Sequence, residues 1–97
     1  MFDKVKQLMD MQNKMQQVKR QLENTVFEVE SSDGSIRIEM DGSQKVRQVK
    51  LQKEMSDVDK TSFESALKDV YNKAIKRSHE LAADEMKKVS GFNIPGL

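Results

Sequence analysis

The sequence has no cysteine and only one histidine among its 97 residues. The lack of cysteine excludes disulfides, thiolate zinc sites and thiol catalysis, and it fits a reducing cytoplasm. His79 alone offers too few ligands for a zinc or iron site within one chain. It lies beside charged residues of a predicted helix, so we interpret it as a surface or interface residue. The sequence therefore predicts no metal site.

Glycine and proline are also scarce, at four and one, and the glycines are isolated from one another. A phosphate-binding loop needs several glycines close together, so no nucleotide-cofactor motif is present. Neighbouring carboxylates such as Asp57 and Asp59 stand where helix capping and solvation explain them. We expect a protein that is not an enzyme and that has no catalytic residue, no cofactor and no small-molecule substrate.

Long hydrophobic runs are absent, and the sequence becomes polar directly after Phe2. A secretory signal or a membrane span would need an apolar stretch of a length that this chain lacks. The absence of such a stretch predicts a protein with no membrane partner. Together with the absence of cysteine, it leads us to expect a cytoplasmic location.

Hydrophobic residues make up 36% of the chain, with one tyrosine and no tryptophan, so a domain of this length has a thin core. We place one domain at residues 1–90 and interpret residues 91–97, which contain the only proline, as a flexible tail. Lys and Arg number 17 against 16 acids, a net charge of +1. Net charge therefore does not separate a nucleic-acid-binding protein from other soluble proteins.

The first part of the chain lacks both glycine and proline and carries apolar residues at alternating steps of three and four. This spacing predicts a helix from Phe2 to Asn24 with one narrow apolar seam, as in a coiled coil or an antiparallel bundle. Methionines in the seam either pack softly against a neighbour, which we favour, or form an adaptable surface for changing partners. The seam, our candidate dimer interface, consists of Leu8, Met11, Met15, Val18 and Leu22.

The next part of the chain changes to a period of two. Thr25–Glu30, Ile36–Met40 and Lys45–Gln52 each alternate apolar and polar residues, and turns that contain Gly34 and Gly42 separate them. Consecutive strands joined by short turns pair side by side in opposite directions. The pattern therefore predicts a three-stranded antiparallel meander with one apolar face.

The third strand departs from simple alternation. Val49 and Leu51 are predicted to point inward, whereas Val46 falls on the opposite parity. A β-bulge near Arg47 would return Val46 to the inner face, because one extra residue reverses the alternation. Without a bulge, Val46 would be exposed. The sequence leaves both interpretations open.

A second helix is predicted from Ser56 to Val89, where apolar residues recur at three- and four-residue steps opposite a charged face. Ser56 and Asp57 would precede its first turn, Asp59 would lie in that turn, and Thr61 to Glu64 is a second possible capping box. Two lysines and then a glycine mark its end. Its predicted apolar face consists of Phe63, Leu67, Val70, Tyr71, Ala74, Ile75, Ser78, Leu81 and Ala82.

These elements give an α+β fold class: a helix, a three-stranded antiparallel β-meander and a long C-terminal helix. The long helix can cover the apolar face of the sheet, which leaves the seam of the first helix without a partner in its own chain. A symmetric dimer, joined through the first helices or through the sheet edges, would bury the seam and enlarge a thin core. We therefore expect a homodimer.

Positive charge is concentrated on the helices. Residues 1 to 24 hold five Lys or Arg against three acids, and residues 73 to 77 form a further short basic run. A dimer would double each cluster and could straddle the phosphates of a duplex, although a solvated helix face would have a similar composition. The scarcity of aromatic residues disfavours stacking on single-stranded bases. The candidate phosphate contacts are Lys4, Lys6, Lys14, Lys19, Arg20, Lys73, Lys76 and Arg77.

Over nearly its whole length the sequence resembles the YbaB/EbfC nucleoid-associated proteins of bacteria. The resemblance lies in the Met- and Gln-rich stretch Leu8–Gln16, in Gly34 and Gly42 at the turns, and in Tyr71–Ala74 of the long helix. Its most specific part is the ending, Gly91–Leu97, with the pattern Gly-x-Asn-x-Pro-Gly. The Gly-rich N-terminal leader that is common in this family is missing.

The resemblance implies an α-β-β-β-α protomer and a tweezer-like homodimer whose helices project as arms. It also implies binding to duplex DNA with low or variable sequence preference, at the nucleoid, with an effect on nucleoid organisation or gene expression. An alternative function is a protein-protein interaction adaptor that uses the Met-rich first helix. The two differ in their response to salt, because phosphate contacts weaken steeply as salt rises and apolar contacts do not.

Overall fold

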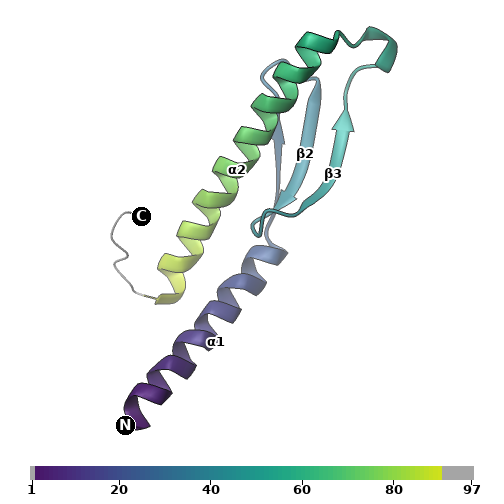
Figure 1. Ribbon diagram of the computed structural model, residues 1–97. Coiled ribbons are helices and arrows are strands. Elements are labelled where there is room, and N and C mark those ends of the chain that lie inside the picture. Colours follow the sequence, from purple (N-terminus) through teal and green to yellow (C-terminus); the bar gives the residue numbers. More distant parts are fainter. Residues whose placement is uncertain (1, 91–97) are drawn as a thin grey trace.

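The computed structural model describes residues 2–90, and the tail predicted at 91–97 lies outside these residues. Its elements follow the predicted order and confirm the α+β class (Figure 1). The three strands form one sheet in the order β1-β2-β3, and both pairs are antiparallel. The elements are α1 (Phe2–Asn24), β1 (Val26–Glu30), β2 (Ile36–Asp41), β3 (Val46–Leu51), the 3₁₀ turn η1 (Met55–Asp57) and α2 (Lys60–Ser90).

The molecule is elongated, with extents of 66 × 24 × 17 Å, because α1 projects from the end of the sheet (Figure 1). α1 has 23 residues and is about 34 Å long. Val18 is its only buried residue among those whose side chains the structure describes. We call α1 the arm, since most of its surface is exposed.

α2 begins at Lys60, so the predicted start at Ser56 is wrong by four residues. Asp59 lies just outside the helix and caps it: its Oδ2 accepts a hydrogen bond of 2.9 Å from the backbone N–H of Ser62. This satisfies one of the donors that a helix start leaves without a partner. Ser56 belongs to the preceding 3₁₀ turn η1 instead.

Of the two interpretations left open for the third strand, the structure shows the bulge near Arg47, although Val46 is still 45% exposed. Glu39 of β2 lies opposite Gln48, but the next residue, Met40, lies opposite Val46, so Arg47 is the extra residue of β3. Directly opposed residues of paired strands project to the same face. The bulge therefore turns Val46 toward the inner face of the sheet.

The core lies between α2 and the first two strands. Its buried members are Ile36, Ile38 and Met40 of β2 with Ala66, Val70 and Ala74 of α2. α2 contacts β1 and β2 and leaves β3 largely uncovered. The prediction that Val49 and Leu51 point inward is confirmed, since they share the inner face of the sheet with Ile38 and Ile36, yet they are 54% and 43% exposed because α2 does not cover them.

The apolar seam of α1 is divided in two by its packing on α2. Val18 is 5% exposed and Leu22 is half-buried, because this end of the arm lies against α2 and the sheet. Leu8, Met11 and Met15 lie toward the N-terminus and are 62%, 45% and 47% exposed. The candidate interface of five residues thus has two that already pack within their own chain and three that remain open.

Candidate nucleic-acid interface

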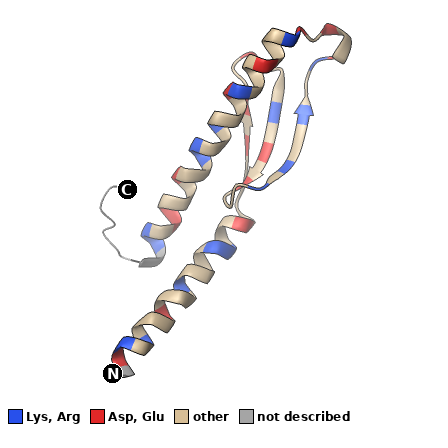
Figure 2. Cartoon of the chain, in the orientation of Figure 1, with Lys and Arg blue, Asp and Glu red and all other residues tan. Residues whose placement is uncertain are grey.

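All five cations of the arm are exposed. Figure 2 shows Lys and Arg in blue along this helix. In the part of the chain that the structure describes, none of them forms an ion pair with an acid. Successive helical residues are about 100° apart, so the five positions are spread around the arm instead of forming one stripe. This distribution supports attraction to phosphates from several sides and provides no single base-reading face. The five cations are Lys4, Lys6, Lys14, Lys19 and Arg20.

Among the predicted phosphate contacts on α2, Lys73 is bound within its own chain, unlike the cations of the arm. The ammonium group of Lys73 lies 3.2 Å from Asp69 Oδ2 and donates to the carbonyl oxygen of Glu30 at 3.2 Å and to Ser32 Oγ at 2.9 Å. Asp69 also accepts the backbone N–H of Ser32 at 2.7 Å. Lys73 therefore helps to fix α2 against the turn that follows β1.

The other two cations of this run differ from each other. Arg77 pairs with Glu80, one turn along the helix, at 3.2 Å. Lys76 is exposed and has no acid partner within the described residues. An exposed pair such as Arg77–Glu80 contributes little stability, so it can open when a phosphate competes for the guanidinium. The structure places Lys76 and Arg77 on α2, separate from the cations of the arm.

The arm is attached to the sheet at the turn between β2 and β3. The backbone N–H of Gly42 donates to the carbonyl oxygens of Leu22 at 2.8 Å and Thr25 at 2.9 Å. Arg47 Nη2 donates to the carbonyl oxygen of Glu23 at 2.6 Å. The last carbonyls of a helix lack donors within the helix, and a cation is favourable near that end. The turn therefore caps the C-terminal end of the arm.

Asp41 holds this attachment together from inside the protein. Its side chain is almost fully buried and lies 3.3 Å from Arg47 Nη2. Burial raises the pKa of Asp41, but hydrogen bonds from Ser43, the backbone N–H of Lys45 and Arg47 outweigh it and lower the pKa overall. Asp41 is thus favoured as a carboxylate, which keeps Arg47 oriented toward the arm.

Comparison with known proteins decides the family. The model of the YbaB/EbfC DNA-binding family matches residues 1–92. The chain belongs to this family. A nucleoid-associated protein of Chlorobaculum parvum is 36% identical over 90 residues, which cover 92% of this chain and 79% of that protein. A nucleoid-associated protein of Syntrophobacter fumaroxidans is 30% identical over 98 residues, which cover 99% of this chain and 89% of that protein. A nucleoid-associated protein of Clostridium acetobutylicum is 28% identical over 95 residues, which cover 96% of this chain and 85% of that protein.

One basic segment of this YbaB/EbfC chain was missed among the candidate contacts. Residues 45 to 53 contain four cations and no acid, a local excess that a count over short windows would have found. Arg47 is engaged with the arm. Lys45, Lys50 and Lys53 form no ion pair among the described residues, although the charge of Lys53 helps to lower the pKa of Asp33. Lysines on an edge strand also discourage pairing with other chains, so their presence alone does not indicate a binding surface.

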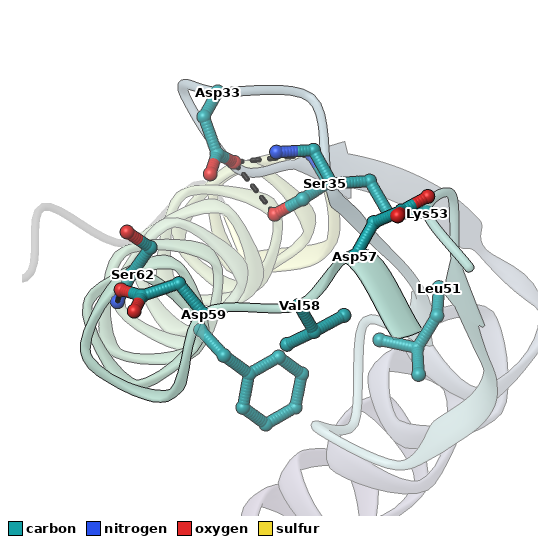
Figure 3. A pocket seen from close by; sticks show the side chains of 9 residues that line it. Asp33, Ser35, Leu51, Lys53, Asp57, Val58, Asp59 and Ser62 are labelled. Carbon is teal, nitrogen blue, oxygen red and sulfur yellow. Dashed lines mark hydrogen bonds between the residues drawn. The ribbon is translucent and has the colours of Figure 1, made fainter. Parts of the chain in front are cut away.

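A small hollow lies at the end of the sheet away from the arm (Figure 3). Its volume is about 80 Å³, smaller than the about 300 Å³ at which typical ligand pockets begin. The carboxylate of Asp33 in its wall already accepts hydrogen bonds from Ser31 and Ser35, which lower its pKa to about 2. Asp59, also in the wall, caps α2. These side chains stabilise the local fold and leave little space for a ligand.

Residues 2–90 contain neither a metal-binding cluster nor a membrane-spanning helix. No three residues of His, Asp or Glu in this range lie close enough to hold a metal ion. No helix in the same range combines the length and the apolar character that crossing a membrane requires. His79 is exposed on α2. Two features of the described surface of this YbaB/EbfC protein remain, the basic arm and an apolar surface on α2 and β3.

That apolar surface begins on one side of α2. Relative to the buried Val70, Asp69 and Lys73 lie about 100° and 60° around the helix toward one flank. Leu67 and Tyr71 lie about 60° and 100° toward the other. Because Asp69 and Lys73 bind the turn after β1, the second flank is on the side of β3. Leu67 and Tyr71 are 44% and 54% exposed.

The same surface continues onto β3. Val46, Val49 and Leu51 all project from the inner face of the sheet, and each is more than two-fifths exposed. One exposed apolar set thus lies on this flank of α2, and the other lies on the inner face of β3. We call the two sets together the β3 trough. It consists of Val46, Val49, Leu51, Leu67 and Tyr71.

Proposed function

We propose that this protein binds duplex DNA as a nucleoid-associated homodimer, through contacts between its arm and DNA phosphates. The observation that carries the proposal is the set of five exposed cations on a projecting helix, none paired with an acid in the described chain. Membership of a DNA-binding family supports the ligand, and the names of the relatives support a place at the nucleoid in the cytoplasm. We further propose low or variable sequence preference and an effect on nucleoid organisation or gene expression.

The proposed contacts fall into two groups. The arm contributes the first group, whose members form no ion pair with an acid among residues 2–90. Lys76 and Arg77 of α2 form the second, since one is free and the other has only an exposed partner. Lys73 remains a candidate, but a phosphate would have to displace its bonds to Asp69, Glu30 and Ser32.

A homodimer is proposed because one chain leaves two apolar surfaces uncovered. One is the open part of the arm's seam, at Leu8, Met11 and Met15, which is the predicted interface. The other is the β3 trough, which stands directly beside the core and would extend it if a second copy covered it. Soluble proteins rarely leave apolar patches of this kind exposed. Either arrangement would present two arms to one duplex.

The experiment that tests DNA binding changes Lys19 and Arg20 of the arm together to Ala. Mobility-shift titrations on several unrelated duplexes, each across a salt series, measure affinity and its salt dependence. Phosphate contacts contribute to all sequences alike, so affinity should fall by a similar factor for every duplex. The slope of log K against log salt should flatten by up to about two charges per protomer, at about 0.9 per charge.

A matched control removes the same number of charges from the other helix. The double change Lys68→Ala and Lys87→Ala has the same effect on net charge but affects exposed positions of α2 outside the proposed contacts. It should leave the salt slope unchanged. Equal effects of the two double variants would show that only bulk charge matters and would overturn the arm as a specific contact. Loss of preference for one sequence alone would indicate base reading instead.

An adaptor function is the second candidate, and the exposure of the Met-rich side of the arm favours it. Leu8, Met9, Met11 and Met15 are all 45% exposed or more, and flexible methionines suit changing protein partners. Binding of this kind buries apolar area and changes little between about 50 and 200 mM salt, the range over which phosphate contacts weaken steeply. A salt-insensitive complex with a protein, together with no shift of any duplex, would favour this function.

A further inference from the structure

The direction of the arm depends on its packing against α2 and on a few hydrogen bonds at its C-terminal end. α1 contacts α2, yet Val18 is the one buried residue among its described side chains. The hydrogen bonds come from the backbone N–H of Gly42, in the turn between β2 and β3, and from the guanidinium of Arg47, in β3. Both donors point at carbonyl oxygens in the last turn of the arm. The orientation of five cations is thus linked to a small number of bonds in addition to the packing on α2.

Close packing at Gly42 makes the attachment rigid. A Cβ atom added at this position would lie 2.8 Å from Leu22 Cδ2 and 3.0 Å from the carbonyl oxygen of Leu22. Only a glycine lets the turn and the arm approach this closely. The backbone therefore sets the distance between arm and turn, and a side chain is needed to set the direction.

Arg47 supplies that side chain. As the extra residue of the bulge, it departs from the alternation of β3, and its guanidinium joins Glu23 of the arm to Asp41 at the end of β2. Asp41 is itself held by the backbone N–H groups of Ser43 at 2.9 Å and Lys45 at 3.1 Å. A planar guanidinium with several donors can bridge a carbonyl and a carboxylate with little freedom of movement.

We propose that Arg47 is a positioning residue for DNA binding: it fixes the direction of the arm and contacts no phosphate itself. The proposal rests on the proposed DNA-binding function. It extends that function by separating two roles among the cations, since those of the arm bind and Arg47 aligns them. Loss of Arg47 leaves the arm charged and helical but lets it sample directions that do not fit a duplex.

The test measures the arm's direction without DNA. Because the chain has no cysteine, nitroxide labels can be placed at Gln12→Cys on the arm and Ser65→Cys on α2. Pulsed electron paramagnetic resonance then gives the distribution of distances between the two labels. The labelled chains are diluted in unlabelled protein, so that only pairs of labels within one chain contribute. Arg47→Ala should broaden the distribution, whereas Lys68→Ala, the loss of an exposed cation elsewhere, should not. An unchanged distribution in Arg47→Ala overturns the proposal.

The same variants are then titrated with DNA. Arg47→Ala should weaken binding about three- to tenfold, as expected when the competent orientation falls to between a third and a tenth of the population. Its salt slope should stay that of the parent protein. A slope flattened by about 0.9 would show that Arg47 contacts a phosphate and would overturn the proposal. A broadened distribution with unchanged affinity would overturn it as well.

The role of Arg47 can still be tested if Arg47→Ala fails to fold or if the parent protein fails to bind DNA. If Arg47→Ala does not fold, Asp41→Asn replaces it, because the amide oxygen can still accept the N–H groups of the turn while the charge that holds Arg47 is lost. Asp41→Asn should also broaden the distribution of distances between the labels, and an unchanged distribution would overturn the proposal. If the parent protein binds no duplex, the DNA-binding function fails, and the distances still decide whether Arg47 fixes the arm.

Discussion

Three Val→Ala variants test which residues belong to the core and which to the dimer interface. Each removes the same two methyl groups, but from a different place in the fold. Val70 lies in the core and is fully buried. Removing its two γ-methyl groups loses about 0.8 kcal/mol of transfer free energy per group. The cavity adds a further amount, so we expect Val70→Ala to lower the free energy of unfolding by about 2–3 kcal/mol. That is a large part of the about 5–15 kcal/mol that a small domain has.

Val5 and Val49 provide the comparison, since their exposed fractions in the single chain are similar at 56% and 54%. Val5→Ala on the arm should change the free energy of unfolding by less than about 0.5 kcal/mol. Val49→Ala should do the same if the β3 trough faces solvent. If a second copy covers the trough, Val49→Ala should instead cost about 1–3 kcal/mol, as a partly buried valine does.

Urea unfolding followed by far-ultraviolet circular dichroism measures all three variants, at two protein concentrations that differ by about a hundredfold. Dimerisation couples stability to concentration, so the parent midpoint should rise with concentration. Val49→Ala should weaken that dependence and Val5→Ala should not. A cost below about 1 kcal/mol for Val70→Ala would refute the core assignment. If Val49→Ala matches Val5→Ala while Met15→Asp alone yields monomers in sedimentation, the interface is the seam of the arm.

Two further predictions follow from the polar contacts. Lys73→Ala should lower the free energy of unfolding by about 0.5–1.5 kcal/mol, because it removes hydrogen bonds and a partly exposed ion pair. The same urea titrations measure this change. The salt dependence of DNA binding should change less in Lys73→Ala than in the double variant of Lys19 and Arg20. Hydrogen bonds lower the pKa of Asp33 to about 2 from 3.8, so the folded state binds its proton less readily than the unfolded state. Its stabilisation is present above about pH 3.8 and is lost as the pH falls toward 2. The urea midpoint of Asp33→Asn should therefore fall less than that of the parent between pH 5 and 2.5, and an equal fall in both proteins would contradict the assignment.

Much of the fold is predictable from the sequence because it depends on local periodicity. The helical spacing from Phe2 onward, the alternation in the strands and the glycines of the turns each reflect neighbouring residues, and all the predicted elements are present. The bulge at Arg47 was one of two interpretations that the sequence left open, because a single extra residue reverses the alternation within one strand. The start of α2 was missed, since Ser56 and Asp59 are both acceptable caps and only the hydrogen bond to Ser62 distinguishes them.

The site was predictable only as a list of cations. That Lys4 and Lys19 would be exposed on a helix follows from their places in the pattern, and the pair Asp69–Lys73 is four residues apart on one helix. Nothing local shows that Lys73 also binds the turn after β1. Its partners at Glu30 and Ser32 lie about forty residues away in the sequence, and only packing brings them together.

The sequence by itself determined the order and type of the elements and the family. Only the tertiary structure decided which apolar residues are covered. Val49 of β3 and Ile38 of β2 are both β-branched residues on the inner face and are paired with each other, yet one is 54% and the other 3% exposed. The difference arises because α2 spans β1 and β2 and does not reach β3. Periodicity gives the face of a strand to which a side chain belongs, whereas its burial depends on how far a distant helix extends across that face.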